Sequence, residues 1–288
     1  MAVPGVPAGL AGLAVPTILA LALAGAPAGC ASATVHVRPT AAPVPAPRAK
    51  RPPVQTALPP GRPTIRTIEL GRSVKGAPLV LEIFGDGPDA VFIFGGIHGS
   101  EPTSAALARS LANRLRINWD LFAGRTVAIL AEANPDGLAK RRRTNANRVD
   151  LNRNFPAENW RPARGAGRRN GSAPASEPET QAIMRATELV QPRRILSIHS
   201  TWHGRHCNNY DGPAEHLAKE MARCNGYPVR ARTRYATPGS FGSWAGIDRG
   251  IPTITLELPR DFDAAQCWRE NSAALLAFVQ AGGERPDG

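Results

Sequence analysis

A histidine and a glutamate stand three residues apart in the segment GGIHGSEP, residues 95–102. The apolar run AVFIF before this segment is typical of a buried strand, so His98 and Glu101 would follow a strand on a glycine-rich turn. Imidazole nitrogen and carboxylate oxygen are both common zinc ligands. The spacing alone also suits a solvated turn, so a metal site would need a further ligand elsewhere in the chain.

Two other chemically capable residues lie in apolar runs. His199 lies in ILSIHS, and Glu257 stands between two leucines in TITLEL. A carboxylate in such a run is costly to bury without a partner. Two histidines and one glutamate form a known ligand set of catalytic zinc sites, which leaves a fourth position open for water.

The elements that must position these residues alternate between strand and helix patterns. Strands are predicted over residues 77–85, 89–96, 125–135, 193–200 and 252–259, and helices over 102–116, 176–190, 214–224 and 264–279. Ser176 and Glu179 have the spacing of a capping box at the start of the second helix. Asn134-Pro-Asp-Gly137 reads as a turn and residues 138–175 as a loop. This alternation predicts an α/β fold with a largely parallel sheet that is covered on both faces.

The polar segments share one kind of position. In sheets of this type, ligands bind beyond the carboxyl ends of the strands. The segments GGIHGSE, ANPDG, SIHS and LELP all stand at the ends of predicted strands. We therefore expect them to lie along the same edge of the sheet.

Five segments together carry a family resemblance: GGIHGSE, NPDG, NANRVDLNRNFP, SIHS and TITLELP. Their order and spacing, from Gly95 to Pro259, resemble the zinc carboxypeptidase family, and within it the bacterial murein peptide amidase group. The resemblance implies a three-layer α/β/α fold with a central, mostly parallel mixed sheet. It also implies one zinc ion per chain, held by His98, Glu101 and His199.

The resemblance assigns further roles around the zinc ion. Glu257 would take a proton from the attacking water and pass it to the leaving amine. Arg143, the last of three consecutive arginines, would stabilise the charge that develops on the carbonyl oxygen. Asn152 and Arg153 would hold the terminal carboxylate of the substrate, because a planar guanidinium can donate two parallel hydrogen bonds to it.

The segment RYATPGSFGSWAG, residues 234–246, supplies more candidates. Tyr235 is a candidate for the tyrosine that some members of the family place on a loop over the site. Ser240 is a predicted substrate-binding residue, and Thr237 and Ser243 are further candidates for substrate contact. A flexible surface loop is the alternative interpretation of this segment.

The resemblance implies a peptide substrate, favouring peptidoglycan stem peptides cut at the bond between γ-D-glutamate and diaminopimelate. The alternatives are a carboxypeptidase acting on protein C-termini, an acyl-amino-acid deacylase, and a non-catalytic module that binds the cell wall. NPDG and DLNRNFP favour a peptidase over the deacylase. Glu257 favours an enzyme over a binding module, which has no need of a proton shuttle.

Charge and cysteine content limit the partners only partly. The formal net charge of +12 over 288 residues favours nucleic acid, anionic lipid or an acidic cell-wall polymer, and also fits a general use of arginine. We predict acidic cell-wall peptides and no nucleic acid. Cys207 and Cys224 could close a disulfide, which would leave Cys267 unpaired. His203 and His206 are interpreted as rim or surface residues because the expected ligand set is complete without them.

The beginning of the chain resembles an export signal. The first 37 residues contain no lysine, arginine, aspartate or glutamate, and residues 10–26 are apolar. We expect a signal segment over residues 1–33, a proline-rich linker over 34–63 and the catalytic domain over 64–288. Cys30 would be a lipoprotein acceptor and membrane tether, cleavage after Ala33 would release a soluble protein, and a retained anchor is the third alternative.

We predict that the mature chain is exported to the periplasm, the cell envelope or the extracellular space. Mass spectrometry of the mature N-terminus decides the route. A diacylglyceryl group on Cys30 identifies a lipoprotein, and an unmodified start at Thr34 identifies soluble secretion. An intact Met1 in the cytoplasmic fraction would contradict both routes.

Overall fold

The computed structural model describes residues 64–163, 169–202, 204–231 and 237–282. The expected signal segment and linker, with Cys30 and Ala33, lie outside the described residues, as do His203 and Tyr235. None of the helices in the described ranges has the length and apolar character needed to cross a membrane.

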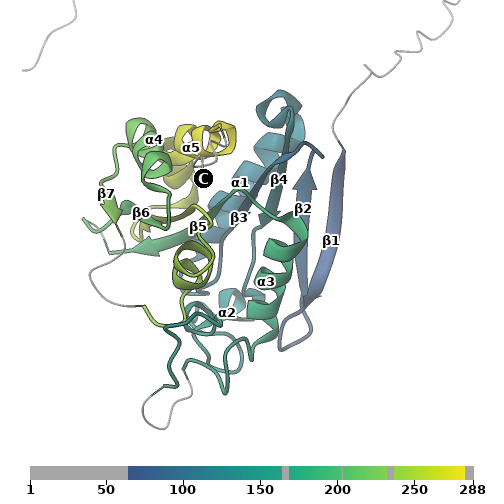
Figure 1. The fold of residues 1–288 in the computed structure, drawn as a ribbon, viewed down its shortest axis with the longest axis vertical. Coiled ribbons are helices and arrows are strands. Elements are labelled where there is room, and N and C mark those ends of the chain that lie inside the picture. Colours follow the sequence, from purple (N-terminus) through teal and green to yellow (C-terminus); the bar gives the residue numbers. More distant parts are fainter. Residues whose placement is uncertain (1–63, 164–168, 203, 232–236, 283–288) are drawn as a thin grey trace, which may run out of the picture. The chain divides into compact units, whose positions relative to one another are not determined.

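A mixed sheet of eight strands forms the centre of the fold, in the order β1-β2-β4-β3-β5-β8-β6-β7 (Figure 1). The strands are β1 (Ile65–Arg72), β2 (Pro78–Phe84), β3 (Asp89–Phe94), β4 (Arg125–Leu130), β5 (Arg194–Thr201), β6 (Cys207–Asp211), β7 (Val229–Ala231) and β8 (Thr253–Pro259). The central strands β4, β3, β5 and β8 run parallel. The pairs β1–β2, β2–β4 and β6–β8 are antiparallel. The mixed sheet predicted from the sequence is confirmed.

Helices cover both faces of this sheet (Figure 1). They are α1 (Pro102–Ile117), α2 (Pro135–Ala139), α3 (Pro178–Val190), α4 (Glu215–Asn225), α5 (Ala264–Gln280), the 3₁₀ turns η1 (Trp119–Phe122) and η2 (Leu151–Arg153), and the π-helical turn η3 (Gly242–Ile247). Buried residues of α1, α4 and α5 form one core cluster with the sheet, here called the α1-side cluster. Those of α3 and η3 form the α3-side cluster on the other face. The fold therefore has the expected three layers.

The alternation of side chains along β5 and β8 directs the candidate site residues to one face. Ile198 belongs to the α1-side cluster, so its neighbour His199 projects towards the α3 side. Leu256 and Leu258 also belong to the α1-side cluster, which places Glu257 on the same face as His199. The two residues are register partners across the parallel pair β5–β8.

Four aromatic rings form the centre of the α3-side cluster. Phe241 packs against Phe94 at a centroid distance of 4.8 Å and against Phe155 at 5.2 Å, both edge-on. Trp244 lies 5.7 Å from Phe155. Edge-on pairs of this kind add to the free energy gained by burying the rings. These rings fix η2 and η3 against the end of β3.

Two local predictions are corrected by the structure. The prediction that Ser176 and Glu179 form a capping box is wrong. Helix α3 begins at Pro178, and its N-cap residue Glu177 makes no side-chain capping bond. Ser176 instead donates to Glu177, and Glu179 accepts from the backbone N–H of Val74. The second correction concerns residues 134–137, which open the short helix α2 rather than a simple turn.

The disulfide that Cys207 and Cys224 could have formed is absent from the described residues, where Cys207, Cys224 and Cys267 are all free. Cys207 is buried in β6, whereas Cys224 is exposed on α4. The two side chains therefore occupy different environments and do not meet. Burial raises the pKa of the Cys207 thiol to about 11, so this group stays protonated near neutral pH.

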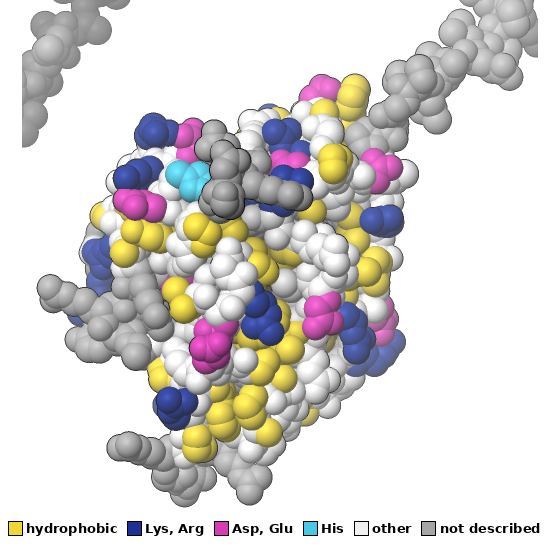
Figure 2. Space-filling view, in the orientation of Figure 1, with side chains coloured by type: hydrophobic (Ala, Val, Ile, Leu, Met, Phe, Trp, Pro, Cys, Tyr) yellow, Lys and Arg dark blue, Asp and Glu magenta, His cyan; other side chains and the backbone are white. Residues whose placement is uncertain are grey.

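The charge on the face drawn in Figure 2 is mixed. Lysine and arginine side chains of the described residues are interspersed there with aspartate and glutamate. This face therefore lacks the continuous basic stripe that is typical of nucleic-acid-binding proteins.

The loop after β3 packs closely against α2. A Cβ atom on Gly99 would lie 1.9 Å from the backbone carbon of Gly137, so only glycine fits at this contact. The Asn134 side chain accepts from the Gly137 N–H at 2.9 Å and donates to the Ile97 carbonyl at 3.1 Å. Asn134 thereby joins the start of α2 to the loop that carries His98.

We expect Gly99→Ala to lower the free energy of unfolding by about 1–3 kcal/mol, the usual cost of forcing extra volume into a packed contact. Urea unfolding followed by circular dichroism measures this difference. Gly282→Ala is the matched control, since a Cβ atom there would meet nothing within 4 Å. Equal stability of the two variants would contradict the close contact.

Candidate metal centre

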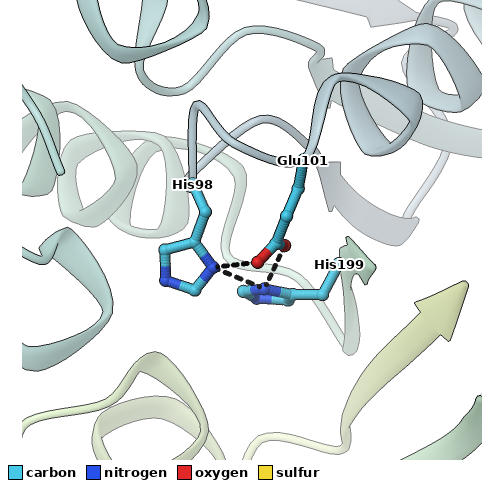
Figure 3. Close-up of side chains that lie close together, drawn as sticks. All are labelled: His98, Glu101 and His199. Atoms are coloured by element: carbon cyan, nitrogen blue, oxygen red, sulfur yellow. Dashed lines mark hydrogen bonds and ion pairs between the residues drawn. The ribbon is translucent and has the colours of Figure 1, made fainter. Parts of the chain in front are cut away.

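Three side chains from two segments, the loop between β3 and α1 and the end of β5, converge at the carboxyl ends of the parallel strands (Figure 3). His98 lies in the loop after β3, Glu101 directly precedes α1, and His199 lies in β5. Their exposed fractions are only 2%, 2% and 4%. His98 Nδ1 lies 2.9 Å from Glu101 Oε1 and 3.2 Å from His199 Nδ1, and His199 Nδ1 lies 3.2 Å from Glu101 Oε2. The structure therefore brings the predicted ligand set together.

The spacing and chemistry of these atoms fit a zinc ion. Tetrahedral bonds of about 2.0–2.1 Å hold ligand atoms about 3.3 Å apart, close to the separations of 2.9 and 3.2 Å found here. Two imidazole nitrogens that face each other can share only one proton, whereas both can donate lone pairs to a cation. The donor set of two nitrogens and one carboxylate is one that zinc prefers.

Asp150 fixes the orientation of the His98 ring. His98 Nε2 lies 3.1 Å from Asp150 Oδ1, so it donates its proton there and leaves Nδ1 for the metal. The sequence prediction omitted Asp150. A usable signal was nevertheless present, because a histidine that binds metal usually donates its second nitrogen to a carboxylate, and Asp150 stands two residues before Asn152.

The buried charges perturb one another strongly. Burial alone would lower the pKa of His98, but the facing carboxylates of Glu101 and Asp150 outweigh this effect and raise it to about 9. Burial opposes ionisation of Glu101 and Asp150, yet the pKa of each falls because His98 favours the charged form. Without a metal ion, His98 therefore carries a proton at neutral pH.

Arg143 reaches the ligand cluster from the segment before η2. Its Nε donates to Asp150 Oδ2 at 2.8 Å, and its Nη1 lies 3.5 Å from Glu101 Oε1. The side chain is 45% exposed, so the guanidinium borders both the cluster and solvent. This position suits a group that stabilises negative charge on a substrate carbonyl oxygen.

Asn152 and Arg153 lie together in η2. Asn152 Oδ1 accepts from the Phe241 N–H at 2.8 Å, which leaves the side-chain NH₂ group as the available donor. Arg153 Nη1 donates to the Asn152 carbonyl at 2.6 Å. Burial lowers the pKa of the Arg153 guanidinium, while Asp150 acts in the opposite direction. Two donors are thus held side by side, as expected for a carboxylate-binding pair.

Glu257 lies beside the cluster without joining it. It is the register partner of His199, but the group of potential ligands comprises only His98, Glu101 and His199 among the described residues. Burial raises the pKa of Glu257, and the charge of Glu101 raises it further, while His199 acts in the opposite direction. A carboxyl group with a raised pKa is well suited to accept and release a proton.

Ser240 and its neighbours form an internal network. Ser240 and Ser243 are both buried, Ser240 Oγ donates to Ser243 Oγ, and it lies 3.1 Å from Thr237 Oγ1. Asn159 donates to Ser243 and accepts from the Gly239 N–H. This network holds the segment whose Phe241 N–H orients Asn152. Direct contact of Ser240 with substrate stays a prediction.

His206 is partly buried and packs against Tyr227. Its ring lies 4.6 Å from the ring of Tyr227, and it is not part of the potential metal-binding group.

Comparison with known proteins places the chain in a family. The pattern that defines the zinc carboxypeptidase family matches residues 61–264. The chain belongs to this family, and it is a hydrolytic metallopeptidase that uses zinc.

Among the individual relatives, murein peptide amidases are similar to this chain over most of its length. The chain is 35% identical over 230 residues to murein peptide amidase A of Escherichia coli (strain K12), covering 74% of this chain and 86% of that protein. The crystal structure of murein-tripeptide amidase from Escherichia coli O157 matches with a TM-score of 0.59 at 30% identity, covering 83% of this chain and 98% of that one. Bovine thrombin-activatable fibrinolysis inhibitor matches in fold alone, with 20% identity, a TM-score of 0.63, and coverage of 75% and 88%.

We expect zinc affinity to rise with pH up to about 9, because metal binding must displace the proton from His98. Below that pH, one released proton makes the apparent affinity rise about tenfold per pH unit. In Asp150→Asn, the pKa of His98 should fall because the carboxylate that raises it is gone. The increase in zinc affinity with pH should therefore end at a lower pH. At high pH the variant should bind zinc about 10–100-fold more weakly than the wild type.

Competition with a chromogenic chelator between pH 6 and 10 measures these affinities. Asp120→Asn is the control, because Asp120 is exposed in η1. A wild-type affinity that is independent of pH, or an Asp150→Asn profile equal to that of the control, would contradict the role of this pair.

Proposed function

We propose that this metallopeptidase hydrolyses the amide bond between γ-D-glutamate and diaminopimelate in peptidoglycan stem peptides. The main support is the 35% identity to murein peptide amidase A, which extends over most of both chains. The site described above supports the proposal because a buried His₂Glu set, a carboxyl group with a raised pKa and two guanidinium groups lie around one position.

The residues divide the chemistry among themselves. When bound, zinc supplies a Lewis acid that polarises the scissile carbonyl and lowers the pKa of water. Glu257 takes the proton of the attacking water and returns it to the departing amine. Arg143 faces the carbonyl oxygen as negative charge develops there. Asn152 and Arg153 grip the carboxylate of the leaving diaminopimelate residue.

A carboxypeptidase acting on protein C-termini would use the same catalytic groups. The acyl-amino-acid deacylase is a weaker alternative because of the segments NPDG and DLNRNFP. The non-catalytic module is weaker because it has no need of the proton carrier Glu257. The murein substrate is favoured because two murein peptide amidases are 33–35% identical to this chain, and the match extends over 86% of the length of each.

We also propose that the chain is exported through residues 1–33 and that residues 34–63 act as a spacer before the catalytic domain. The support is the charge-free apolar start and the proline-rich composition that follows. With Cys30 as the lipid acceptor, this spacer would tether the enzyme to a membrane.

The wild-type protein with zinc should cleave L-Ala-γ-D-Glu-diaminopimelate faster than hippuryl-type peptides or N-acyl amino acids. Chromatography of the products gives kcat/KM for each class. Faster cleavage of hippuryl peptides would favour the general carboxypeptidase, and release of acyl groups would favour the deacylase.

Amidation of the diaminopimelate carboxylate next to the scissile bond should make the substrate poor for the wild type. Arg153→Gln should raise KM for the free acid and leave the amide unaffected. Arg153→Lys should not restore the wild-type KM, because an ammonium group cannot form the two-pronged contact. Equal cleavage of acid and amide by the wild type would contradict this role.

Glu257→Gln should keep zinc and substrate affinity, since Glu257 is not a metal ligand and the amide is nearly isosteric. It should lose about 10²–10⁴-fold in kcat, the usual contribution of a positioned acid or base. Metal analysis and steady-state kinetics measure both properties. Wild-type turnover in this variant would exclude Glu257 as the proton carrier, and His199→Ala, which should lose zinc, serves as the contrasting variant.

A further inference from the structure

A second arginine approaches the metal ligands from the side of β5 and β8. Arg260 directly follows β8, and its backbone N–H donates to the Thr201 carbonyl at the end of β5. Arg260 Nη2 donates to the Ser200 carbonyl at 3.3 Å and lies 3.6 Å from Glu101 Oε1. Its guanidinium carbon lies 5.1 Å from the centroid of the Trp202 ring.

The contacts of Arg260 leave much of its bonding capacity unused. Its side chain is 36% exposed, and its Nε and Nη1 have no hydrogen bond to any other described residue. Arg194 shows the contrast, because it is buried and directs its Nε, Nη1 and Nη2 to Asp89 and to two carbonyl groups of α5. Arg194 is thus saturated within the fold, whereas Arg260 can still donate to a ligand.

Trp202 holds the Arg260 guanidinium in place at the surface. The ring is 67% exposed although it directly follows a buried strand beside the metal ligands. The electron-rich face of the ring attracts the Arg260 guanidinium above it. The two residues thus place an available cation beside the ligand cluster.

Arg260 and the Asn152–Arg153 pair are linked to the ligand cluster through different residues. The pair is connected to His98 through Asp150, whereas Arg260 is connected to His199 through Ser200. A substrate whose leaving-side carboxylate lies at Asn152 and Arg153 would extend its acyl side towards β5 and β8. A cation there would meet the residue that supplies the scissile carbonyl.

We propose that Arg260, supported by Trp202, binds a carboxylate on the acyl side of the scissile bond, namely the free α-carboxylate of a γ-linked D-glutamyl residue. This inference rests on the proposed function. Three methylene or methine carbons separate that carboxylate from the scissile carbonyl, a span of about 5 Å. An ordinary peptide carries a neutral amide at this distance, so Arg260 would select the γ-glutamyl linkage. Arginine suits the task because its fork can bind a carboxylate with two hydrogen bonds.

The test compares L-Ala-γ-D-Glu-diaminopimelate with its D-isoglutamine analogue, in which only the α-carboxylate is converted to an amide. The zinc-loaded wild type should favour the acid by about tenfold in kcat/KM, as expected for one charge-assisted contact. Arg260→Gln should lose this preference by slowing cleavage of the acid while leaving the analogue unchanged. Arg223→Gln, at an exposed arginine of α4, is the matched control and should retain the preference.

A binding measurement separates recognition from catalysis. Calorimetry measures the affinity of the metal-free protein for the product L-Ala-D-Glu and for its α-amide. The wild type should bind the acid more tightly than the amide, and Arg260→Gln should lose this difference. Zinc content, measured for each variant, should stay at the wild-type value.

The outcomes distinguish the two levels of the proposal. Equal cleavage of acid and analogue by the wild type would overturn the subsite and leave the murein function intact. An equal loss on both substrates in Arg260→Gln, or a loss of zinc, would assign Arg260 a structural role near Glu101 and also overturn the subsite. Cleavage of hippuryl peptides but of neither murein peptide would overturn the proposed function, and the subsite with it.

Discussion

The buried carboxylate of Glu101 connects nearly every element that builds the site. Its oxygens lie 2.9 Å from His98 Nδ1 and 3.2 Å from His199 Nδ1, and Oε2 accepts from the Ser200 N–H, so Glu101 joins the loop after β3 to β5. Arg143, from the segment before η2, and Arg260, from the segment after β8, both lie near Glu101 Oε1. Burial of this charge would be prohibitive without such partners. Because Glu101 directly precedes α1, the position of that helix and the position of the metal ligands depend on each other.

The sequence predicted the central strands because their apolar runs are continuous. β3, β4 and β5 are buried on both faces, and this burial requires apolar side chains at successive positions. The outer strands of the sheet, such as β1 and β6, carry a weaker signal. β1 is mostly exposed, and β6 reads CNNYD, which resembles a polar loop. The side chain of Asn208 in β6 is satisfied by Asn225 and the Tyr227 carbonyl, contacts that only the folded chain supplies.

The π-helical turn η3 shows a similar limit. Its sequence GSWAGI, rich in glycine and serine, left a flexible surface loop open as an alternative interpretation, yet Ser243 and Trp244 are buried. The small residues are needed there for close packing, since a Cβ atom on Gly246 would lie 2.5 Å from Asp211 Cβ. Composition alone does not distinguish a flexible loop from a closely packed segment, because small residues are common in both.

The candidate site was more predictable than the fold around it. His98, Glu101 and His199 follow recognisable strand ends, and parallel strands bring such ends together. Asp150 and Arg260 were not singled out, because each acts through a contact with a residue distant in sequence. A sequence motif shows only which residue types are present. The roles of Asp150 and Arg260 depend on contacts between segments that are distant in sequence.

The aromatic cluster on the α3 side has a consequence for how the protein can change over evolutionary time. Phe241 belongs to that cluster and also donates the backbone bond that orients Asn152. A substitution among these rings would therefore displace Asn152, a predicted substrate-binding group, even where stability survives. The α1-side cluster carries no comparable link to Asn152 in the described part of the chain. Apart from its residues in α1 and next to His199 and Glu257, its aliphatic residues can be replaced by others of similar volume with an effect mainly on stability. Neutral substitutions should therefore accumulate in α4 and α5, while the α3-side cluster stays constrained.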